Sequence, residues 1–240
     1  RSGASCGGSR SPARICRPPV SSFLKISRVA HNAFLLESAE QEEKIGRFSF
    51  LGTDPAAVYE ATEKNVTVTA KGNRKILKSA RVVDVIESEL ATNRLANPEV
   101  FPGFCGGFVG YLSYENVRDF ETLRLSKKRG PGFPLGIFFR VEDFVVFDHF
   151  RKTLSVVVLA DLKKSGTTTA AYKRAIRQME KYKKLLKKPL RLSDTRKVTS
   201  LPEVRPNMSR RDYESKVRRI KEYIRAGDCI QVVLSQRFQL

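Results

Sequence analysis

The first residues with a chemical pattern are Glu37 and Ser38, which follow the apolar run at 33–36. A carboxylate and a hydroxyl stand side by side where the chain turns, and an acidic stretch at 40–43 separates them from the next apolar segment. Together they can donate and accept hydrogen bonds to a small polar ligand. The residues alone leave two interpretations open: a strand end that faces solvent, or a small polar site on the rim of a core.

The glycines of "CGGFVGY", residues 105–111, suggest a second site, a phosphate-binding loop. A P-loop needs a Gly-Lys-Ser/Thr sequence that leads into a helix, and neither feature follows here. Glycines inside a strand more often mark a bulge or a close approach of two backbones. We therefore predict structural roles for Gly106, Gly107 and Gly110.

Composition excludes several other kinds of site. His31 and His149 are the only histidines, which argues against a histidine-based metal cluster and a Ser-His triad. The four cysteines are scattered without a C-x-x-C pair, as expected in a reducing compartment. The longest apolar runs have the length of a strand and are far too short to span a membrane.

The net charge of +20 is concentrated in two segments. Residues 1–17 contain four arginines and no acid, and residues 163–197 contain 13 Lys or Arg residues against Glu180 and Asp194. The second segment includes a predicted basic helix, whose apolar face is formed by Tyr172, Ala175, Ile176, Met179, Tyr182 and Leu186. We interpret its lysines as a solvated face. The alternative, a basic nucleic-acid-binding module, has no accompanying zinc-finger, RRM or KH signature.

The pattern predicts strands from Val20 onward. They are expected at 34–37, 48–51 and 57–61, in a hairpin at 65–77, and within 104–115, 136–150 and 154–161. A helix is predicted at 81–92, before the basic helix at 172–188. A last helix begins after the N-cap Ser209, with Asp212 in the capping-box position, and ends at Gly227. A strand is then expected from Cys229, and because the sequence stops inside it we expect a fragment.

Four quoted segments carry a resemblance to a known family. They are "AFLLESAEQEEKIGRFSFLG" (33–52), "GGFVGYLSYENVRDFE" (106–121), "VVFDHFRKTL" (145–154) and "YESKVRRIKEYIRAGDCIQVVLSQRF" (213–238). In this order they resemble anthranilate synthase component I, the chorismate-using subunit of the first committed step of tryptophan synthesis. The resemblance covers residues 19–240 and leaves out residues 1–18, which we interpret as a disordered or artefactual tail.

The resemblance implies an α+β fold of antiparallel sheets packed with helices. It implies a regulatory amino-terminal domain at 19–165, a basic helix and linker at 166–206, and an incomplete start of the chorismate-binding domain at 207–240. It also implies that the full-length enzyme converts chorismate and ammonia to anthranilate and pyruvate, and that L-tryptophan inhibits it. A glutamine amidotransferase subunit (component II) would supply the ammonia. A Mg²⁺ ion would be held by residues beyond 240, so no metal ligand is assigned here and this chain alone is expected to be inactive.

The resemblance also assigns roles to single residues. Ser38, with Glu37 beside it, would bind the polar backbone of tryptophan. Gln231 would lie in the substrate pocket, where related enzymes that add water to chorismate carry a lysine. A glutamine amide has no basic site near neutral pH, so Gln231 favours amination over hydration. Arg47 is placed to pair with the acids at 40–43 across the turn.

Two alternatives to this function remain. Aminodeoxychorismate synthase component I shares a motif much like "GDCIQVVLSQRF", although the segment at 33–52 fits the tryptophan branch better. The nucleic-acid-binding module is the alternative from another class. We expect a cytoplasmic protein without membrane attachment, or a plastid protein if residues 1–18 are the remnant of a transit peptide.

Overall fold

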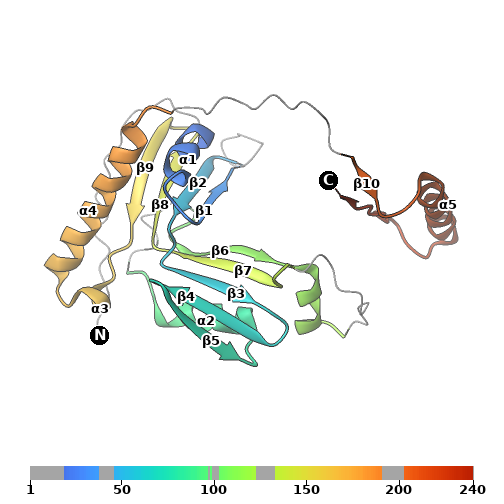
Figure 1. The fold of residues 1–240 in the computed structure, drawn as a ribbon, viewed down its shortest axis with the longest axis horizontal. Helices are drawn as coiled ribbons and strands as arrows, with labels where there is room; N and C mark the ends of the chain where they lie inside the picture. Colours follow the sequence, from blue (N-terminus) through green and yellow to red (C-terminus); the bar gives the residue numbers. More distant parts are fainter. Residues whose placement is uncertain are drawn as a thin grey trace. The chain divides into compact units, whose positions relative to one another are not determined.

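The computed structural model describes residues 19–37, 46–96, 98, 103–122, 133–190 and 203–239. The chain divides into two compact units, a first unit at 1–191 and a second unit at 192–240. Each unit is described by itself (Figure 1). Strands and helices are mixed, and every strand pairing is antiparallel, which confirms the predicted α+β class.

The first unit contains two sheets. The five-stranded sheet has the order β5-β4-β3-β7-β6, and the four-stranded sheet has the order β1-β2-β8-β9. The strands are β1 (Ala33–Leu36), β2 (Phe48–Thr53), β3 (Ala57–Ala61), β4 (Asn65–Ala70), β5 (Asn73–Lys78), β6 (Gly107–Leu112), β7 (Gly136–Val141), β8 (Asp143–Asp148) and β9 (Thr153–Val158). Its helices are α1 (Pro19–Ser27), α2 (Val82–Thr92), the 3₁₀ helix η2 (Tyr114–Asp119), α3 (Leu162–Ser165) and α4 (Thr168–Lys187).

Three apolar clusters stack these elements in four layers. Helix α2 covers the five-stranded sheet through a cluster around Tyr59 and Val82. The two sheets face each other through a second cluster, in which Phe139 of β7 meets Phe144 of β8. Helices α1 and α4 cover the outer face of the four-stranded sheet through a third cluster. The layer order is therefore helix, sheet, sheet, helix (Figure 1).

Alternation along the strands produces this stacking. In β8, Phe144 and Val146 face the other sheet, whereas Val145 and Phe147 face α1 and α4. Successive side chains of a strand point to opposite faces, so a strand buried on both sides is apolar at every position. The run "FVVF" at 144–147 is such a strand, and all four residues are buried.

Three predictions from the pattern need correction in this unit. Strands were expected from Val20 onward, the first at 34–37, but residues 19–27 form helix α1, because Pro19, Ser22 and Ile26 are spaced by three and four and bury one helical face. The apolar stretch at 136–150 is two strands, β7 and β8, which belong to different sheets and meet at Glu142. Tyr172 of the basic helix is exposed, and Ala171 takes the buried position instead.

The glycines of the 105–111 segment have the structural roles that were predicted. A Cβ on Gly110 of β6 would collide with the backbone of Ile137 and Phe138 in the neighbouring strand. Gly106 has a φ of +97°, which side-chain-bearing residues rarely adopt. These glycines allow β6 to pair closely with β7.

The second unit contains helix α5 (Arg210–Ala226) and a short pair of β10 (Arg205–Pro206) with β11 (Phe238–Gln239). The predicted caps of α5 are confirmed: the Ser209 side chain accepts a hydrogen bond from the Asp212 amide, and Gly227 adopts the left-handed conformation. The strand predicted from Cys229 is wrong over residues 229–237. A strand needs a neighbour to satisfy its backbone groups, and among the described residues only 205–206 provide one.

Candidate functional site

Glu37 follows the last residue of β1 and is exposed. The β1–β2 pairing places Leu36 opposite Phe50, so Glu37 lies beside the beginning of β2. Its predicted partner Ser38 lies outside the described residues, and so do the acids at 40–43. The pairing of Glu37 with Ser38 as a ligand site therefore stays a prediction.

The structure places a polar cluster at the beginning of β2, next to this strand end. The Nε and Nη2 atoms of Arg47 donate hydrogen bonds to the two carboxylate oxygens of Asp148, at 3.1 and 2.8 Å. Asp148 is the last residue of β8 and lies 101 positions away along the chain. A bidentate pair of this kind fixes the orientation of the guanidinium as well as its position.

Aromatic rings hold the same guanidinium. The Arg47 guanidinium carbon lies 4.9 Å from the ring centre of Phe48 and 5.4 Å from that of Phe150. The Asp148 carboxylate also accepts hydrogen bonds from the backbone amides of Phe150 and Arg151. Burial alone would raise the pKa of Asp148, but Arg47 and the Arg151 amide outweigh it and hold that pKa below its usual value. The cluster therefore carries a stable ion pair at neutral pH.

A second contact lies one step further along β2. The hydroxyl of Ser49 is 2.7 Å from Nε2 of His149, and Ser49 is fully buried. The backbone amide of His149 donates to the carbonyl of Arg47 at 2.8 Å. A buried serine has no access to a substrate, so this pair fixes the start of β2 against the end of β8 and is no catalytic dyad.

The sequence pattern did not indicate Asp148, Ser49 or His149 as members of one cluster. In the sequence, the segment "VVFDHF" shows only that a charged residue, Asp148, and one of the two histidines, His149, directly follow an apolar run. The β2–β8 register, in which Phe48 pairs with Asp148, brings them to Arg47. Sequence spacing contains no information about such a long-range register.

Gln231, the predicted substrate-pocket residue, lies in the second unit. Its side chain is exposed, and residues 231–237 have no regular secondary structure. Nearby, Gln236 donates a hydrogen bond from Nε2 to the carbonyl of Met208, and the Arg237 amide donates to Oδ1 of Asn207. The segment is thus tied to the residues before α5, and the role of Gln231 stays a prediction.

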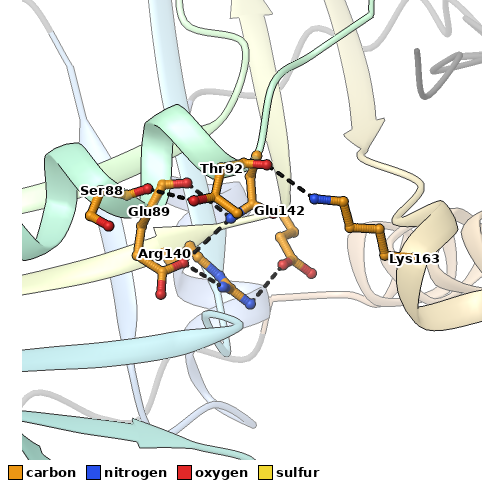
Figure 2. A network of polar contacts seen from close by, with 7 residues as sticks. Ser88, Glu89, Thr92, Arg140, Glu142 and Lys163 are labelled. Atoms are coloured by element: carbon orange, nitrogen blue, oxygen red, sulfur yellow. Dashed lines mark hydrogen bonds and ion pairs between the residues drawn. The ribbon is translucent and has the colours of Figure 1, made fainter. Parts of the chain in front are cut away.

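A further polar network lies where the chain crosses from one sheet to the other (Figure 2). Arg140 of β7 extends between Glu89 of α2 and Glu142, with nitrogen-to-oxygen distances of 3.3 and 3.0 Å. The amine of Lys163 donates to the carbonyl of Thr92 at the end of α2, at 3.1 Å. We call these five residues the joint. It links α2 and β7 to the beginning of α3.

The described residues contain no group of three or more His, Cys, Asp or Glu side chains that could hold a metal ion. The Mg²⁺ ion implied by the resemblance stays a prediction. None of the described helices is long and apolar enough to cross a membrane.

The chain is similar to a known family and to several known proteins. The family model described as chorismate binding enzyme matches residues 31–240. The chain is 35% identical over 231 residues to anthranilate synthase component 1 of Pseudomonas aeruginosa, with 92% of this chain and 46% of that protein covered. It is 34% identical over 233 residues to the protein of the same name from Pseudomonas putida, with 92% and 45% covered.

A solved structure shows the same fold. The crystal structure of anthranilate synthase component I from Streptococcus pneumoniae aligns with a TM-score of 0.54 at 21% sequence identity. The alignment covers 84% of this chain and 43% of that chain. The chain thus spans somewhat less than half the length of the relatives that it matches.

Proposed function

Because the chain belongs to the chorismate binding enzyme family, we propose that it is the amino-terminal part of an anthranilate synthase component I. The whole protein would add ammonia to chorismate and eliminate pyruvate, which leaves anthranilate. The observation that carries this proposal is the match over residues 31–240, which continues from the first unit into the second. The two Pseudomonas relatives are both named anthranilate synthase component 1.

The second unit supports the view that more of the enzyme follows. None of the residues of α5 is buried, and Ile230 and Val233 are 98% and 82% exposed. Apolar side chains of this size normally pack against another element. We propose that they pack against the portion of the protein that corresponds to the other half of the relatives.

The same portion would hold the metal and most of the substrate contacts. Since the described residues lack a group of metal ligands, the whole protein would bind Mg²⁺ outside them. Gln231 would face the substrate from this chain. Its neutral amide can donate and accept hydrogen bonds but cannot deprotonate water, so it would favour ammonia as the nucleophile. A glutamine amidotransferase subunit would deliver that ammonia.

Regulation would lie in the first unit. We propose that Glu37 and Ser38 bind the ammonium and carboxylate groups of L-tryptophan at the end of β1. The exposed position of Glu37 beside β2 leaves it accessible to a ligand. The adjacent Arg47–Asp148 pair, held by two rings, would give the site a rigid border.

An assay of product formation tests the catalytic proposal. The protein extended to the length of its relatives should form fluorescent anthranilate from chorismate, Mg²⁺ and ammonium. The 240-residue chain should form none above a no-protein control. Without ammonium, the extended protein should form negligible isochorismate or salicylate. Anthranilate from the short chain, or rapid hydration of chorismate by the long one, would contradict the proposal.

Substitution of Ser38 tests the regulatory proposal in the extended protein. Loss of a hydrogen bond to a charged ligand costs about 1.5 to 3 kcal/mol, so Ser38→Ala should weaken tryptophan inhibition roughly tenfold or more. The rate without tryptophan should change little. Ser88→Ala, an exposed serine on α2, is the matched control and should leave inhibition intact. Unchanged inhibition in Ser38→Ala would assign that serine to the turn alone.

A further inference from the structure

A carboxyl group lies in the contact between α4 and the four-stranded sheet. Asp143 is the first residue of β8 and directly follows Glu142, where the chain crosses from one sheet to the other. It is partly buried, and Nε2 of Gln178 in α4 donates a hydrogen bond to its Oδ2. Asp143 therefore belongs to the surface on which α4 rests.

The surroundings of Asp143 disfavour its negative charge. Glu142 lies beside it in the chain, and Asp54, at the other crossing between the sheets, also faces it. From α4, Lys181 is the cation that acts on it, and the Lys181 side chain is exposed to solvent. The buried hydroxyl of Tyr182 lies near the carboxyl, and because burial raises the pKa of Tyr182 this group stays neutral.

Burial of the carboxyl raises the pKa of Asp143 to about 6. The neighbouring acids Glu142 and Asp54 also raise this pKa, whereas Gln178 and Lys181 lower it in part. A carboxyl whose pKa is raised by folding stabilises the folded form only while it is protonated. The contact is therefore most stable below the ordinary pKa of 3.8, weakens as the pH rises from there, and reaches its weakest state above about 6.

We propose that Asp143 makes the docking of α4 on the four-stranded sheet sensitive to protons: α4 docks tightly when the carboxyl is neutral and loosens when it is ionised. The Gln178 bond persists in both states, since a carboxylate also accepts from an amide. The two protonation states differ in docking because the ionised carboxylate is stabilised by water. Water reaches the carboxylate once α4 moves away.

The ion pairs of the joint do not involve Asp143 or α4. Arg140 is paired with Glu89 of α2 and with Glu142. We therefore expect the contact between α2 and β7 to persist while α4 loosens.

Hydrogen exchange of the 240-residue chain tests the proposal. Protection factors of the α4 amides, corrected for the intrinsic pH dependence of exchange, should fall roughly tenfold from pH 5 to pH 8. Amides of the β4–β5 hairpin belong to the other sheet and serve as the internal reference, with no matching fall. Equal falls in α4 and the hairpin would show that Asp143 acts on the whole fold, and the proposal would be wrong.

The variant Asp143→Asn separates the effect of the carboxylate charge on α4 from the effect of losing the Gln178 hydrogen bond. The amide stays neutral, so α4 protection should become independent of pH and exceed that of the unmodified chain at pH 8 by roughly tenfold or more. Glu60→Gln, the same change at an exposed position of β3, is the matched control and should keep the fall. If Asp143→Asn retains the fall, or lowers protection at pH 8, the proposal fails.

A second variant covers the case in which Asp143→Asn does not fold. Gln178 lowers the pKa of Asp143 through its hydrogen bond, so Gln178→Ala should move the midpoint of the fall in α4 protection to a higher pH. An unchanged or lower midpoint would contradict the proposal as directly as a flat profile in the unmodified chain.

Discussion

Helices α4 and α5 are both long, basic and amphipathic, yet only α4 buries an apolar stripe. Residues Ala171, Ala175, Met179, Tyr182 and Leu186 of α4 are buried, whereas α5 has no buried residue. Both helices begin at a side-chain N-cap, Thr167 in α4 and Ser209 in α5. Caps and periodicity thus specify a helix, but a facing surface decides whether the helix adds tertiary stability.

The two units also differ in the reach of their ion pairs. In the unit that contains α4, Arg47 binds Asp148 across 101 positions, and the side chains are 25% and 11% exposed. On α5, Arg210 binds Glu214 one turn away, and these side chains are 93% and 47% exposed. Screening by water makes the second kind of pair weak. Long-range, shielded contacts therefore distinguish the first unit from the second.

The largest expected difference concerns the apolar stripes. Leu186→Ala should lower the free energy of unfolding by about 2 to 5 kcal/mol, because it leaves a cavity among α1, α4 and the four-stranded sheet. Ile220→Ala on α5 should change it by less than about 1 kcal/mol, since that side chain is only half-buried and alanine favours a helix. Urea unfolding followed by circular dichroism measures both. Similar losses would remove the distinction between the helices.

The next difference concerns the ion pairs. Asp148→Asn should cost about 1.5 to 3 kcal/mol at pH 7, because it removes charge-assisted hydrogen bonds from a shielded site. The pKa of Asp148 is lowered by folding, so its contribution is present above the unfolded pKa of 3.8 and is lost as the pH falls below it. The gap between Asp148→Asn and the unmodified chain should therefore close in acid.

Glu214→Gln is the matched change on α5 and should cost about 0.5 kcal/mol or less. Urea midpoints of the three proteins, measured from pH 7 down to pH 3, give the comparison. A gap for Asp148→Asn that stays constant across this range would mean that the carboxylate charge is not what stabilises the contact with Arg47.

The smallest expected effect concerns the caps. Ser209→Ala should destabilise α5 by about 1 kcal/mol, since the Asp212 amide loses its partner at 3.1 Å. Because α5 lacks buried residues, this loss should appear as lower helicity of residues 210–226 in NMR chemical shifts. Thr167→Ala removes the equivalent bond to Ala170 in α4, but packing should keep that helix formed. Equal fraying of both helices would show that packing does not support α4.

Much of the local structure could be predicted from the sequence. Both long helices, the cap pair Ser209 and Gly227, and the hairpin of β4 and β5 follow from residue types within one or two turns of chain. The motifs at 33–52 and 213–238 likewise pointed to the family that matches residues 31–240. These signals are local or linear, so no tertiary contact is needed to detect them.

The tertiary structure decided the rest. Only the β2–β8 register brings Asp148 and His149 to Arg47 and Ser49, and only the sheet crossing at Glu142 divides one apolar stretch into two strands. The apolar residues after Cys229 have high β propensity, but they form no strand over 229–237, where the described chain offers no partner strand. A helix satisfies its backbone within itself, whereas a strand, a buried charge or an ion pair depends on residues that the chain brings from elsewhere.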